Sequence, residues 1–175
     1  MVNETGAAEH YVRLMRATTE AMGIVPLRQV AQLPGTRAVY RVTTYHHQRR
    51  VADAVITLRR SGAQDALVEA VYLGCFGHQP LRRALSLTQF EAFTSALQRV
   101  DFDHLSDQPA LASHDVNVWR VERAAGSFLK SVLVMPHQAF GTYAGLVTLL
   151  RTVLPEAQRE LLTTESVFVK VDITK

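Results

Sequence analysis

Residues 117–136 read NVWRVERAAGSFLKSVLVMP and have the pattern of a β-hairpin. In the first arm the apolar Trp119 and Val121 alternate with Arg120 and Glu122, which predicts a strand with one buried and one polar face. The second arm becomes continuously apolar over residues 132–135, a pattern typical of a strand covered on both faces. Gly126 can adopt the positive φ that a tight hairpin loop needs.

Trp119 is the only tryptophan in the chain. A tryptophan on the apolar face of a strand usually anchors a core, because its large side chain dominates local packing. We therefore predict that Trp119 is a core residue. A ligand-stacking role remains the alternative.

Four further strands are predicted before the hairpin. Alternating apolar residues, broken by turn residues about every ten positions, indicate an antiparallel meander of strands at residues 38–44, 51–59, 66–73 and 82–87. A last strand is predicted at residues 166–173, where Val167, Val169, Val171 and Ile173 alternate with polar residues and Phe168.

Apolar residues at helical spacing predict four helices, at residues 7–22, 88–100, 140–154 and 156–162. Thr88 and Glu91 have the spacing of a capping box at the start of the second helix. Residues 24–36 contain Pro26, Pro34 and Gly35, which predict a connection with little regular structure.

These elements predict a single α+β domain over residues 1–175, with residues 1–6 frayed. An antiparallel sheet forms its centre, and amphipathic helices pack on one face of that sheet. The 175 residues are 47% hydrophobic and 20% charged, which is the composition of a globular domain and excludes a disordered chain.

The sequence also indicates the cellular compartment of the protein. Cys75 is the only cysteine, so no intrachain disulfide can form. No run reaches the ~18 apolar residues of a membrane span, and the polar start MVNETGAAEH lacks the features of a signal peptide. We expect a cytoplasmic protein, or a periplasmic one if a leader has been removed, with no membrane partner.

Residues with catalytic chemistry are few and scattered. His114 and Asp115 could form an oriented general base, with Cys75 or a serine as nucleophile, but neither nucleophile lies in a known catalytic motif. No glycine-rich phosphate loop is present. His46 and His47 are adjacent and would point to opposite faces of a strand, so we predict a solvated turn there. No metal or cofactor is expected.

Three arginine pairs come nearest to a nucleic-acid motif: Arg49-Arg50, Arg59-Arg60 and Arg82-Arg83. The first two pairs would lie at opposite ends of one strand, which argues against a continuous basic patch. Few aromatic residues accompany them, although base stacking needs such side chains. With a net charge of +3, the chain gives only weak support for an acidic partner.

One series of residues spans the region from the 88–100 helix to the end of the hairpin: Asp101-Phe102, then Asp115, Trp119, Glu122, Gly126, Phe128 and Pro136. This series resembles the pattern of a family of small uncharacterised bacterial α+β domains. In those domains a helix ending in an Asp-Phe pair is followed by Asp, Trp-x-x-Glu, Gly-x-aromatic and Pro. The resemblance implies the fold and no activity.

The leading hypothesis is a non-enzymatic protein-binding domain, specifically a bacterial immunity-type inhibitor that neutralises a cognate toxin or effector. Such a protein needs only a rigid surface with a hot-spot patch. The residues around the hairpin are the candidate binding residues: His114, Asp115, Trp119, Arg120 and Glu122. A small hydrolase or transferase that uses His114, Asp115, Glu122 and Cys75 is the alternative, and nucleic-acid binding through the arginine pairs is a weaker one.

Overall fold

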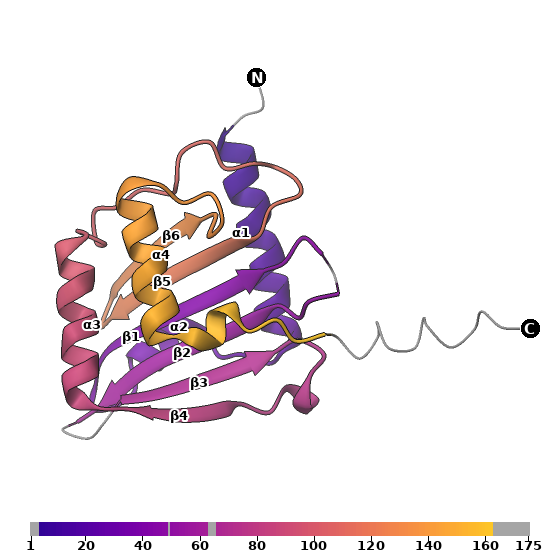
Figure 1. Cartoon of the computed structure of the whole chain (residues 1–175). Helices are drawn as coiled ribbons and strands as arrows, with labels where there is room; N and C mark the ends of the chain where they lie inside the picture. The colour runs from indigo at the N-terminus through magenta and orange to yellow at the C-terminus, as the bar shows by residue number, and fades with distance from the viewer. Residues whose placement is uncertain (1–3, 49, 63–65, 163–175) are drawn as a thin grey trace, which may run out of the picture.

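A six-stranded antiparallel sheet forms the centre of the computed structural model, which describes residues 4–48, 50–62 and 66–162 (Figure 1). The strands lie side by side in the order β4-β3-β2-β1-β5-β6. Their bounds are β1 Thr36–Tyr45, β2 Ala54–Ser61, β3 Ala66–Tyr72, β4 Leu81–Leu85, β5 Val118–Ala125 and β6 Phe128–Val134. The predicted meander is therefore confirmed, and the hairpin of β5 and β6 is added beside β1.

The hairpin predicted around Gly126 is confirmed. Trp119 pairs with Val134 near one end of the ladder, and Ala125 pairs with Phe128 at the other. Gly126 has a φ of +56°, in the left-handed region where glycine has no steric penalty. A Cβ at this position would meet nothing within 4 Å, so only the backbone conformation requires glycine.

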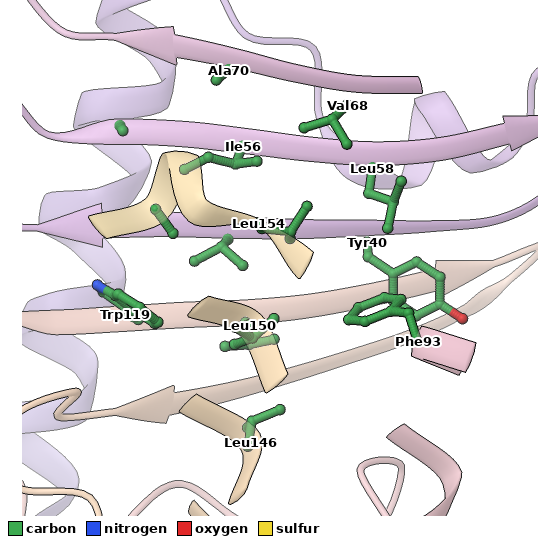
Figure 2. Close-up of a cluster of buried hydrophobic side chains, with 14 of the residues drawn as sticks. Tyr40, Ile56, Leu58, Val68, Ala70, Phe93, Trp119, Leu146, Leu150 and Leu154 are labelled. Carbon is green, nitrogen blue, oxygen red and sulfur yellow. The ribbon is translucent and has the colours of Figure 1, made fainter. Parts of the chain in front are cut away.

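Two helices and a 3-10 turn cover one face of the sheet: α3 Leu87–Arg99, α4 Gly141–Val153 and η2 Pro155–Gln158. They enclose the largest hydrophobic core, in which Leu146, Leu150 and Leu154 pack over the sheet (Figure 2). Trp119 lies in this core with 3% of its surface exposed, as predicted for an anchor residue. Arg151 lies over its ring, 5.9 Å from the centroid.

The opposite face of the sheet is also covered, by α1 Glu4–Ala21 and α2 Leu27–Ala31 (Figure 1). The single α+β domain with an antiparallel sheet is confirmed, but helices pack on both faces, where the sequence pattern predicted one. Three small hydrophobic clusters hold this second layer: Tyr11 with Leu133, Leu27 with Val39, and Met22 with Val55 and Val71.

The short elements differ most from the sequence prediction. Residues 24–36 contain the helix α2, and the predicted helix 156–162 is the 3-10 turn η2. The capping box of α3 uses Ser86 and Gln89, two positions before the predicted Thr88 and Glu91. Arg49 and the predicted strand at residues 166–173 lie outside the described residues.

Among the helices that the structure describes, none is both long and apolar enough to cross a membrane.

Candidate binding site

The face of the sheet beneath α1 and α2 has a charged centre instead of a continuous core. It consists of Arg41 on β1, Thr57 on β2, Arg120 and Glu122 on β5, and Ser131 on β6; we call it the polar centre. Strand pairing sets Arg41 opposite both Thr57 and Glu122, and Glu122 opposite Ser131. Because directly paired residues share a face of the sheet, these side chains meet under the helices.

The side chains of the polar centre are held in fixed geometry. Arg120 forms an ion pair with Glu122, with 2.9 Å between Nη2 and Oε1, and its Nε donates to Ser131 Oγ at 3.0 Å. Arg41 donates from Nε to Thr57 Oγ1 at 3.2 Å and from Nη2 to the Val25 carbonyl at 3.0 Å. Arg41 is 5% exposed and Glu122 is 7% exposed, so both charges lie away from bulk water.

Burial shifts the titration of both groups in the direction of the neutral form. It lowers the pKa of the Arg41 guanidinium, against the opposing effect of Glu122. It raises the pKa of the Glu122 carboxyl, although Arg120 and Arg41 pull it downward. The positive charges therefore do not fully offset the desolvation of the one carboxylate, as expected when ions are taken out of water.

A groove of about 380 Å³ opens beside the polar centre. Its floor is formed by β1, β2 and β3, one wall is the segment from Met22 to Leu33, and the other wall contains His78 and Pro80. Most of the lining is aliphatic, while Arg41, Thr57, Arg59 and Glu69 supply polar atoms on the floor. A concave, mainly apolar site with a few convergent polar groups is the usual form of a binding site.

The rim of the groove exposes aliphatic side chains. Val25 is 51% exposed and Leu33 is 49% exposed, and both line the groove. Single exposed aliphatic residues are ordinary on protein surfaces. Here two of them border an open groove with a buried guanidinium on its floor, which makes this face the best candidate for binding.

The five candidate residues from the sequence divide into three groups. Arg120 and Glu122 belong to the polar centre. Trp119 points into the opposite core. His114 and Asp115 are exposed in the segment before β5, where Asp115 lines a cavity of about 170 Å³ with His47, Asn117 and His137.

The candidate catalytic residues do not converge. Cys75 follows β3, and β2 and β1 separate that strand from β5, which carries Glu122. Three spacings of about 4.8 Å put these strands roughly 14 Å apart. Burial raises the pKa of the Cys75 thiol, opposite to the shift that activates a nucleophile.

The next two features concern the predicted turn at His46 and His47 and the metal-ligating residues. His46 is 8% exposed and its amide donates to Asp53 Oδ1 at 2.8 Å, so half of the predicted solvated turn is buried. Within the described part of the chain, no group of three or more His, Cys, Asp or Glu side chains is arranged to hold a metal ion.

The pleat of the sheet divides two of the arginine pairs between its faces. Arg59 and Arg82 both pair with Glu69, at 3.4 and 2.9 Å, on the groove side. Arg60 lies over the Phe90 ring on the other face. Arg83 forms a bidentate pair with Glu156 on that face as well.

A larger groove of about 530 Å³ lies between α3 and α4. Its lining is mainly apolar and includes Arg83, which pairs with Glu156, and the exposed Arg99. The groove beside the polar centre differs from it because its Arg41 is buried on the floor.

Arg41 is the main site residue that sequence reasoning did not identify. It stands in an ordinary alternation with Val39 and Thr43, which is typical of a solvent-facing strand side. The sequence does contain a signal that this face of the sheet is covered, because the apolar face of the 7–22 helix needs a surface to pack against. Only the strand register and the position of α2 show that Arg41 is buried.

The sequence matches no protein-family model, and a comparison with curated proteins finds no match. The resemblance to the uncharacterised bacterial domains stays a prediction.

Proposed function

We propose that this protein is a non-enzymatic protein-binding domain of the immunity type, which neutralises a toxin or effector by occupying its surface. The observation that carries the proposal is the groove between the α1–α2 layer and the sheet. It combines an aliphatic rim with a buried guanidinium on a rigid floor. Protein interfaces commonly place an apolar core and arginine anchors in this way.

The geometry favours binding over catalysis for a physical reason. The charged side chains near the groove are tied to each other or to the backbone. A hydrolase or transferase needs a nucleophile and a base within hydrogen-bond reach. Cys75 and Glu122 are too far apart to meet that requirement, and the Glu122 carboxyl is engaged with Arg120.

The test is co-expression and pull-down with the product of the neighbouring gene. We expect that product to be toxic alone, to lose toxicity when this chain is present, and to form a complex at micromolar concentration. Leu33→Asp should weaken the complex by about tenfold or more, because a charge replaces an apolar rim contact.

Phe140→Asp is the matched control. Phe140 is 58% exposed and lies at the start of α4, on the layer that covers the other face. The same change there should leave the affinity unaltered. A neighbour without toxicity, or the absence of a complex at micromolar concentration, contradicts the proposal.

A further inference from the structure

The groove and the polar centre carry more positive than negative charge. Glu122 forms an ion pair with Arg120 and attracts Arg41 electrostatically without a direct ion pair. Arg59 and Arg82 share the carboxylate of Glu69 at the edge of the groove. Four guanidinium groups therefore face two carboxylates.

Two guanidinium groups line the groove; Arg59 forms an ion pair with Glu69, whereas Arg41 has no direct ion pair among the described residues. Arg41 lines the groove although its residue is 5% exposed, so it lies at the bottom of the groove and not on the rim. Acceptors among the described residues take two of its five N–H donors, one at Thr57 and one at Val25. The remaining N–H groups can donate to an anion without breaking an existing hydrogen bond.

A buried guanidinium such as Arg41, with no direct ion pair in the described part of the chain, is incompletely compensated. Removing a guanidinium from water costs several kcal/mol, and an anion at hydrogen-bond distance offsets that cost. A planar carboxylate fits the guanidinium fork in a bidentate way. The floor of the groove therefore favours a carboxylate from the binding partner.

The surrounding surface selects what is attached to that carboxylate. Val55 and Val71 lie on the floor beside Arg41, and Ile24 and Val25 form the near wall. These side chains stabilise aliphatic groups and offer no hydrogen bonds to a strongly hydrated one. Val25 and Leu33 continue the aliphatic surface from the groove onto its exposed rim.

We propose that the groove receives an acidic side chain of the partner protein, carried in a segment where aliphatic residues flank it. The carboxylate pairs with Arg41 and the neighbouring aliphatic side chains cover the rim. This inference rests on the proposed function, because it names the part of the partner that the site recognises.

The direct test uses the full chain and two blocked peptides, acetyl-Leu-Glu-Leu-Leu-amide and acetyl-Leu-Gln-Leu-Leu-amide. Both peptides carry the same aliphatic residues and differ only in charge. In ¹⁵N NMR titrations we expect the glutamate peptide to bind about tenfold more tightly or better, and to shift the Nε–Hε signal of Arg41. Equal affinity for the two peptides, or no binding of either at millimolar concentration, overturns the inference.

Arg41→Lys keeps the charge and loses the fork, so the preference for the glutamate peptide should fall to within about threefold. Arg123→Lys is the matched control, because Arg123 lies on the other face and pairs with Asp103. If Arg41→Lys does not fold, the comparison of the two peptides on the unaltered chain still decides the question.

The inference and the proposed function can fail separately. A toxin complex whose affinity is unaffected by Arg41→Lys removes the inference and keeps the function. A glutamate preference without any neutralised toxin keeps the recognition chemistry and removes the function.

Discussion

The charged centre on the α1–α2 face of the sheet depends on Glu122. This residue is the carboxylate within reach of both Arg41 and Arg120, and all three are wholly or largely buried. An ion pair of this kind adds little net stability compared with apolar packing. Removing one partner is costly, however, because the other charge then stays buried without a counter-ion.

Glu122→Ala should lower the free energy of unfolding by about 3 kcal/mol, because Arg41 and Arg120 would then lie together without their carboxylate. Urea denaturation followed by Trp119 fluorescence measures this loss. Glu69→Ala is the comparison, since the Glu69 side chain is 22% exposed and its pairs lie at the surface. A loss below about 1 kcal/mol is expected there. Equal losses for the two variants would contradict the assignment of a buried charge centre.

The physical reason that Arg41 escaped prediction is that its local sequence is ambiguous. A strand side bearing arginine, threonine and glutamate normally faces water. The same pattern arises when a polar site is built inside the protein. Periodicity identifies which residues share a face but gives no information on what covers that face.

At the scale of elements, local rules specified the hairpin and the long helices. The alternation around Trp119 and the glycine at the turn are both local signals. The helix α2 was missed because it is five residues long and is flanked by Pro26 and Pro34, which usually mark a connection. Such a helix forms through its contacts with β1 and β5, which bury Leu27 and Ala31.

The start of α3 gives a direct test of the cap. Ser86 Oγ accepts from the Gln89 amide at 3.3 Å, and Gln89 Oε1 accepts from the Ser86 amide at 3.1 Å. Ser86→Ala should cost about 1 kcal/mol of stability. Thr88→Ala should leave the stability unchanged or raise it by a few tenths of a kcal/mol, because Thr88 is exposed inside the helix, where alanine is the better helix former. Thermal unfolding of the two variants measures the difference, and the reverse order would place the cap at Thr88.

Two glycine-to-alanine substitutions, one in the hairpin loop and one in α1, should change the stability in opposite directions. Gly126→Ala should destabilise by about 1 kcal/mol, because alanine at positive φ brings its Cβ close to the backbone. Gly6→Ala should stabilise by roughly 0.5–1 kcal/mol, because Gly6 is exposed within α1 and alanine favours helix. Denaturant midpoints check both values, and stabilisation by Gly126→Ala would rule out the observed loop.

At the scale of the whole molecule, the sheet separates two unlike layers. The α3–α4 side has a continuous hydrophobic core (Figure 2). The α1–α2 side has three small clusters of described residues around a charged centre. The first layer supplies most of the apolar burial, so the second can carry charge and a groove without loss of the fold.

The first layer is joined to the sheet edge by one ion pair that should respond to acid. Burial raises the pKa of the Glu156 carboxyl, but the hydrogen bond from Arg83, a hydrogen bond from the Glu156 backbone and the charges of Arg83 and Arg159 together outweigh burial and hold the pKa below its ordinary value of 4.5. A lowered folded-state pKa means that this carboxylate stabilises the fold above pH 4.5, and that the contribution is lost as the pH falls through the folded value.

Glu156→Gln should therefore be less stable than the unaltered chain by about 1 kcal/mol at neutral pH, since Arg83 is partly exposed. The difference should shrink below the ordinary value of 4.5 and vanish in stronger acid. Urea midpoints from pH 7 to pH 3 measure it. A difference that stays constant with pH would show that the pair makes no electrostatic contribution.

We propose that the α1–α2 face, with its groove and charged centre, binds the partner. Hydrogen–deuterium exchange of the full chain, alone and in complex with the neighbouring gene's product, distinguishes this face from the α3–α4 face. We expect exchange to slow in residues 22–33 and in the groove-facing part of β2, and to stay unchanged in α3 and α4. Protection confined to α3 and α4 would contradict the claim.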